Sequence, residues 1–129
     1  YDASWSLDCG KDCAMEKCFA CLNCRAIDMA KIGRLILNDG VWGDEQVLSS
    51  SFINEATKRD SSQGSCYGYQ YNFRLGPREY GTIYASGLYG QLIYIYPRNN
   101  VIIIRVGETD TKYNPQFILQ TMLQIIDQL

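Results

Sequence analysis

The chain has 129 residues, of which 47% are hydrophobic, and a net charge of -2, so it is long and apolar enough for one packed domain. Lys and Arg are scattered among Asp and Glu, which argues against a nucleic-acid partner, and the apolar runs are far shorter than the roughly 20 residues of a membrane span. The absence of histidine excludes a Ser-His-Asp or Cys-His site within these residues, and no cofactor is expected.

The first half of the chain predicts two helices joined by a turn. Apolar residues recur at steps of three and four over residues 26–37, and the Asn-Asp-Gly sequence at 38–40 is a typical helix stop. Gly43 and Asp44 are expected at the tip of a small turn. The serines that follow are expected to cap a short helix over residues 52–58.

The second half predicts strands and then a helix. Residues 67–75 alternate between aromatic or apolar and other side chains, which is the period of a half-buried strand. A further strand is expected over residues 92–96, followed by a turn and by the run VIIIRV at 101–106, which predicts a central strand covered on both faces. Asn114 and Pro115 then begin a C-terminal helix with a wide apolar stripe. The expected fold is α+β, an antiparallel meander with this helix packed on it, as a single domain or half-domain over residues 1–129.

Three phrases carry a resemblance to a known family. They are DASWSLD at 2–8, FACLNCRAIDMAKIGRLILNDGVWGDEQVLS at 19–49 and YASGLYGQLIYIYP at 84–97. In this order they resemble the C-terminal half of the penicillin-recognising, or β-lactamase-related, serine hydrolases, nearest to the branch of esterases and aminohexanoate-dimer hydrolases. The resemblance implies a β-lactamase/transpeptidase-like fold, in which an antiparallel sheet is flanked by the terminal helices.

That family cleaves esters or amides with a Ser-x-x-Lys nucleophile, a tyrosine motif and a Lys-Thr-Gly-like triplet on a strand. No lysine here has a serine three residues before it, and Tyr-x-Asn is absent. Ala85, Ser86 and Gly87 occupy the place of the triplet. The resemblance implies that the N–H of Leu88 is an oxyanion donor and that Ser86, Gly87 and Gln91 bind the substrate. The alternative is that these residues form only a glycine-permitted turn before a strand.

The missing motifs suggest that the sequence is the second half of a larger domain. The resemblance then implies an exposed sheet edge and an exposed apolar helix face, and a partner that is either the missing N-terminal half or a second copy. The substrate would be a small ester or amide. The competing hypothesis is a non-catalytic binding or assembly module with the same fold. The cellular compartment stays open.

Six cysteines raise a third hypothesis, a metal-binding module. Cys18, Cys21 and Cys24 fit the first three positions of a bacterial iron–sulfur motif, but no cysteine or proline follows at the required interval. Thiols packed as small apolar residues are one alternative, since Cys21 stands where the resembling family has glycine. Disulfides between more distant cysteines are another.

Overall fold

The computed structural model of the chain describes residues 3–9, 14–17, 21–64, 68–108 and 114–129. The helices are α1 (Ala26–Leu37), α2 (Ser50–Thr57) and α3 (Pro115–Ile126), and two 3-10 turns are η1 (Leu88–Gly90) and η2 (Pro97–Asn99). Two short antiparallel pairs are formed by β1 (Ser4–Trp5) with β2 (Leu22–Asn23), and by β3 (Val41–Trp42) with β4 (Glu45–Gln46). The main sheet consists of β5 (Tyr69–Gln70), β6 (Phe73–Leu75), β7 (Ile83–Ser86), β8 (Leu92–Tyr96) and β9 (Val101–Arg105).

Helix α1 has the bounds that its apolar spacing predicts. At its start, Arg25 provides no side-chain cap, and its Nε instead donates to the carboxylate of Asp28 at 3.2 Å. At its end, the N–H of Gly40 donates to the carbonyl oxygen of Leu35 at 2.8 Å. Gly40 has a φ of +82°, and a Cβ there would lie 2.1 Å from the carbonyl oxygen of Leu48, so the predicted stop requires glycine.

Helix α2 begins two residues before the predicted start. The Ser49 hydroxyl accepts a hydrogen bond from the N–H of Phe52 at 3.2 Å, which is the expected serine cap. Between α1 and α2, the pair β3–β4 forms the predicted turn with Gly43 at its tip, where φ is +62°.

The main sheet is the predicted antiparallel meander, because its five strands pair in chain order. The register between β7 and β8 places Tyr84 opposite Tyr94 and Ser86 opposite Leu92. This register brings the end of β7 beside the start of β8, where the candidate site lies.

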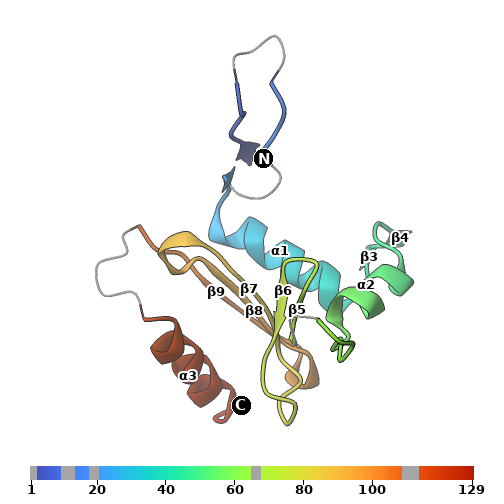
Figure 1. The fold of residues 1–129 in the computed structure, drawn as a ribbon, viewed down its shortest axis with the longest axis vertical. Helices are drawn as coiled ribbons and strands as arrows, with labels where there is room; N and C mark the ends of the chain where they lie inside the picture. Colours follow the sequence, from blue (N-terminus) through green and yellow to red (C-terminus); the bar gives the residue numbers. More distant parts are fainter. Residues whose placement is uncertain (1–2, 10–13, 18–20, 65–67, 109–113) are drawn as a thin grey trace.

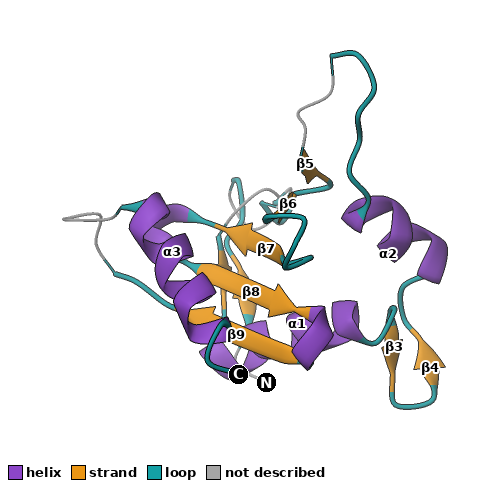
Figure 2. Ribbon diagram, turned by 90° about the horizontal axis from the view of Figure 1, so that it is seen from below, coloured by secondary structure: helices purple, strands orange, loops and turns teal. Residues whose placement is uncertain are grey.

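Helices cover opposite faces of this sheet (Figures 1 and 2). On one face, α3 packs on alternate residues of β8; the buried cluster there is Leu92, Tyr94, Tyr96, Met122 and Ile126. On the other face, Ile95 packs against Ile36 of α1 and Ile53 of α2. The prediction that the C-terminal helix covers one face is therefore confirmed, and the fold is α+β.

The prediction of one strand over residues 67–75 is wrong. Strands β5 and β6 pair as a hairpin in which Gln70 lies opposite Phe73. The two residues between them, Tyr71 and Asn72, have φ values of 47° and 64°. Positive φ at both central residues is typical of a type I′ turn. A period of two cannot distinguish one long strand from two short strands joined by such a turn.

The prediction that residues 101–106 form a central strand is also wrong, because β9 lies at the edge of the sheet beside β8. Coverage of both faces is confirmed. Gly33 of α1 lies so close to β9 that a Cβ would be 2.8 Å from Cγ2 of Ile102, and Ile103 packs against the cluster under α3. A run of β-branched residues reflects burial of the faces and carries no information on the number of neighbouring strands.

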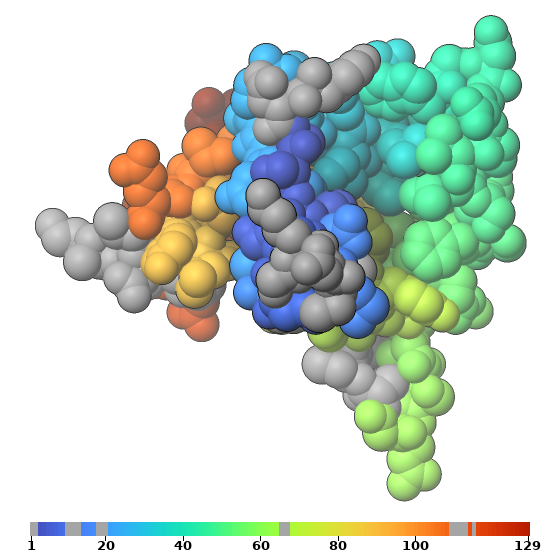
Figure 3. All heavy atoms as spheres, turned by 90° about the horizontal axis from the view of Figure 1, so that it is seen from above, coloured from blue at the N-terminus to red at the C-terminus, as the bar shows by residue number. Residues whose placement is uncertain are grey.

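The pair β1–β2 belongs to an arm that extends beyond α1, away from the sheet (Figure 1). Figure 3 looks at the molecule from this end, with the blue residues of the arm in front of the body. Neither core cluster contains any of the arm's described residues. Among the described residues, no helix combines the length and apolar character that a membrane crossing needs.

Candidate functional site

The predicted triplet lies where β7 ends and the chain turns into β8. Ala85 and Ser86 are the last two residues of β7, and Gly87 follows as the residue before η1. The N–H of Gly87 donates to the carbonyl oxygen of Gln91 at 2.9 Å. The N–H of Gln91 donates to the carbonyl oxygen of Leu88 at 3.3 Å. These bonds close a tight loop, which we call the 87–91 turn.

The 87–91 turn begins with a backbone donor that is available to a ligand. Leu88 is 71% exposed, and its N–H has no acceptor among the described residues. The first N–H groups of a helical turn have no partner within the turn, so they bind capping groups or ligands. Farther along, Tyr89 has a φ of 59° and Gly90 a φ of 76°. The left-handed conformation costs a non-glycine residue of order 1 kcal/mol or more, so the surroundings must hold Tyr89 in place.

Gln91 makes contacts that the sequence did not predict. Its side-chain Nε2 donates to the carbonyl oxygen of Gly107 at 2.5 Å, and its Oε1 accepts from the N–H of Gly107 at 3.3 Å. Both ends of the amide are therefore engaged with backbone just beyond β9. Gln91 thus links the turn to that backbone.

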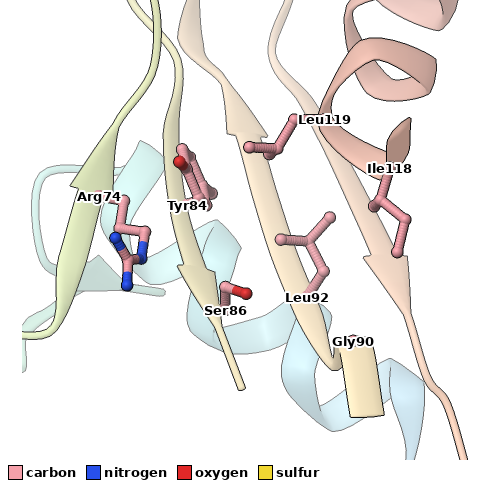
Figure 4. A pocket seen from close by; sticks show the side chains of 7 residues that line it. All are labelled: Arg74, Tyr84, Ser86, Gly90, Leu92, Ile118 and Leu119. Atoms are coloured by element: carbon pink, nitrogen blue, oxygen red, sulfur yellow. The ribbon is translucent and has the colours of Figure 1, made fainter. Parts of the chain in front are cut away.

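A pocket of about 270 Å³ opens beside Ser86, between the sheet and α3 (Figure 4). Its polar lining comes from β6 and β7, and its apolar lining comes from β8 and α3. The residues that line it are Arg74, Tyr84, Ser86, Gly90, Leu92, Ile118 and Leu119.

Strand register explains why the polar residues of this pocket share one face. Arg74 lies opposite Tyr84, and Ser86 lies two residues farther along the strand from Tyr84, on the same face. The Arg74 guanidinium carbon lies 4.9 Å from the centre of the Tyr69 ring. The pocket thus combines a cation and hydroxyl groups with an apolar wall, which suits a small molecule with a polar and a hydrocarbon part.

The floor of the site is built from packed and hydrogen-bonded side chains. The ring of Tyr84 stacks on that of Tyr94, with centroids 5.8 Å apart, and the Tyr94 hydroxyl bonds to Oγ1 of Thr82 at 3.2 Å. Burial raises the pKa of Tyr94, and the hydrogen bond with Thr82 opposes that shift only in part. Tyr94 is therefore a neutral packing residue at physiological pH. Arg74 and Tyr84 were missed as site residues because their sequence pattern is that of ordinary strand residues.

Among the residues that the structure describes, the cysteines form no metal site. Cys18, the first member of the predicted metal set, lies outside the described residues, as do Cys13 and Cys66. Within residues 3–9, 14–17, 21–64, 68–108 and 114–129, no group of three or more Cys, Asp and Glu side chains is placed to hold a metal ion.

Cys21 and Cys24 are free thiols with different surroundings. Cys21 is exposed, so the expectation of a packed thiol is wrong at this position, but its φ of 68° fits a site where glycine is usual. Cys24 is half-buried, and burial, with a smaller effect of the Asp28 carboxylate, raises the pKa of its thiol. A raised pKa makes Cys24 a poorer nucleophile and metal ligand.

Comparison with known proteins finds a relative among solved structures. The structure titled "Putative 6-aminohexanoate-dimer hydrolase from Bacillus anthracis" matches with a TM-score of 0.72 and 27% sequence identity, over 86% of this chain. No protein-family model and no curated protein matches the chain. The match covers 30% of the solved structure, so the chain spans less than a third of that protein's length. The likeness in both sequence and fold relates the chain to the β-lactamase-like hydrolases.

Proposed function

We propose that this chain is the C-terminal part of a β-lactamase-related serine hydrolase that cleaves ester or amide bonds through an acyl-enzyme. The observation that carries the proposal is the 87–91 turn. It presents the N–H of Leu88, which has no acceptor among the described residues, directly after the triplet Ala85-Ser86-Gly87. The relation to a hydrolase structure supports the assignment.

In this proposal, the chain supplies the oxyanion side of the site. The N–H of Leu88 donates to the negative oxygen that develops when the substrate carbonyl is attacked. Gly87 allows the substrate to approach the backbone, and the Ser86 hydroxyl hydrogen-bonds to it. Gln91, which the resemblance includes among the substrate-binding residues, serves the site through its bonds to Gly107.

The nucleophile comes from sequence outside these 129 residues. A serine activated by a lysine and a tyrosine attacks the carbonyl carbon, and the alcohol or amine leaves with the transferred proton. Water then attacks the acyl-enzyme and releases the acid. The pocket beside Ser86, of about 270 Å³, favours a small substrate over a macromolecule.

The partner in this proposal is the N-terminal part of the same hydrolase. Strand β9 is a sheet edge with four β-branched residues, and an unpaired strand edge readily accepts another strand. Ile27 on α1 is 59% exposed and Phe117 on α3 is 66% exposed, so these two helices present apolar side chains to solvent. Such surfaces are usual where a further part of a protein packs.

The same surfaces favour a second candidate, a non-catalytic module that binds or assembles with another protein. An exposed apolar surface requires no reaction, whereas an oxyanion donor has a purpose only beside a nucleophile. The two functions therefore differ in whether a backbone donor at Leu88 matters for hydrolysis.

Substitution at Leu88 tests the proposed function. Leu88→Pro removes the N–H and keeps a conformation that suits the first residue of a helical turn, because the preceding Gly87 is extended. In the complete hydrolase, we expect ester hydrolysis to lose about 10²- to 10³-fold in kcat, as for other oxyanion donors. Leu88→Ala is the matched control, since it removes the exposed side chain but keeps the N–H. Equal rates for the two variants would contradict the proposal.

A further inference from the structure

The end of β9 reaches across to the 87–91 turn through one arginine. Nη1 of Arg105 donates to the carbonyl oxygen of Tyr89 at 3.1 Å and to that of Gly90 at 2.7 Å. These are the two residues of the turn with left-handed backbone. Arg105 had no role in the sequence interpretation, because it lies within the strand predicted over residues 101–106 and is 16 positions from Tyr89 along the chain.

Gly107, two residues after Arg105, brings its backbone close to the 87–91 turn. A Cβ at Gly107 would lie 2.1 Å from the carbonyl oxygen of Tyr89, so no other residue fits without moving the turn. The backbone of Gly107 is also the group that bonds to both ends of the Gln91 amide. Arg105 and Gly107 thus hold three consecutive residues of the turn. These are Tyr89, Gly90 and Gln91.

We propose that Arg105 and Gly107 form a clamp that positions the N–H of Leu88 for catalysis. Arg105 is a positioning residue in this inference, because it touches the turn and not the substrate. The inference rests on the proposed function for its catalytic meaning. The physical contact between clamp and turn is independent of that function.

The chemistry of the clamp explains why an arginine is present. Tyr89 is held in a conformation that costs a non-glycine residue free energy, and hydrogen bonds from a charged donor are about twice as strong as neutral ones. The guanidinium offers several N–H groups in a fixed plane, so it can hold two neighbouring carbonyl groups at once. A lysine ammonium at the end of a flexible stem fixes their relative orientation less well.

The clamp also connects the turn to the sheet edge. Arg105 ends β9, which is one of the two edge strands of the described sheet. A segment that pairs with β9 therefore fixes the strand from which the clamp extends. In the proposed hydrolase, the part that pairs with β9 orders the oxyanion turn as well as completing the sheet.

Hydrogen exchange in this chain tests the clamp without any need for activity. We expect Arg105→Met to speed exchange of the Gly90 and Gln91 amides about tenfold or more, since a charge-assisted bond is lost. Amides of the buried strand β8 should keep their wild-type rates, which would show that the fold is intact. Arg98→Met, in the exposed turn η2, is the matched control and should leave the 87–91 turn unchanged. Unchanged exchange at Gly90 and Gln91 in Arg105→Met would overturn the clamp.

Kinetics of the complete hydrolase test the positioning role. Arg105→Met is expected to lower kcat with little change in KM, and Arg105→Lys to recover part of the loss. Gly107→Ala, whose Cβ displaces the Tyr89 carbonyl and also crowds Nη1 of Arg105, should lower kcat in the same way. Faster exchange with unchanged kcat in these variants would refute the positioning role. Equal rates for Leu88→Pro and Leu88→Ala would instead refute the proposed function, while the exchange result still decides the clamp.

Discussion

The hydrogen bond between Tyr94 and Thr82, beneath the pocket, predicts a loss of stability whose magnitude follows from the structure. Tyr94 and Thr82 are each 1% exposed, and the tyrosine hydroxyl lies 3.2 Å from Oγ1 of Thr82. Tyr94→Phe keeps the ring that stacks on Tyr84 and removes the hydroxyl alone. The Thr82 hydroxyl is then left in a site that water does not reach.

The expected loss of unfolding free energy for Tyr94→Phe is about 1–3 kcal/mol, which is the cost of leaving a buried polar group without its partner. Thr82→Val removes the other hydroxyl at nearly constant shape and should cost a similar amount. The double variant leaves neither hydroxyl unsatisfied, so it should be more stable than the sum of the single losses predicts. We expect a coupling energy of about 1 kcal/mol or more.

Urea unfolding followed by circular dichroism measures all four proteins of this cycle. Tyr71→Phe is the control, since Tyr71 is exposed and its substitution should change stability by no more than about 0.5 kcal/mol. Additive losses, with a coupling energy near zero, would refute the claim that these hydroxyls bond to each other and hold the floor of the pocket.

Two further predictions concern helix ends. The Asn114 side chain accepts hydrogen bonds from the N–H groups of Gln116 and Phe117 at 3.0 and 3.2 Å. Asn114→Ala should therefore lower the free energy of unfolding by about 1 kcal/mol, measured by urea unfolding. An unchanged urea midpoint would argue against this cap. Hydrogen bonds from Lys31 and then Arg25 lower the pKa of Asp28 below its ordinary value of 3.8. The ionised carboxylate of Asp28 therefore stabilises the fold above about pH 3.8, and this contribution is lost as the pH falls through the pKa of Asp28 in the folded protein. The difference in Tm between wild type and Asp28→Asn should shrink below about pH 3.8, and a difference independent of pH would contradict this assignment.

Much of the fold was predictable where the signal is local. The 3.6-residue spacing and glycine stop of α1, and the Asn-Pro start of α3, are read within a few neighbouring residues. The hairpin at Tyr71 and Asn72 was missed because Asn72, a residue that turns favour, stands within an alternating run of aromatic residues that is typical of a strand. The edge position of β9 was missed because the order of strands depends on pairing between distant segments.

The candidate site was predictable only in part for the same reason. Ser86, Gly87 and Leu88 stand together in one phrase that resembles a known family, so the sequence points to them directly. Arg74 reaches the pocket through the register of β6 with β7. Arg105 reaches the turn only because β8 and β9 pair. Contacts of this kind become visible once the strands are placed in space.

The central claim is that this chain is the oxyanion side of a serine hydrolase whose nucleophile lies elsewhere. The most direct test is intact-mass spectrometry under denaturing conditions, after the protein is purified with its associated polypeptides and treated with a fluorophosphonate that labels active serines. The account predicts that these 129 residues stay unmodified, and that the adduct lies on upstream sequence or on a co-purifying polypeptide. An adduct on a serine of this chain would contradict the account, and no adduct anywhere would favour the binding module instead.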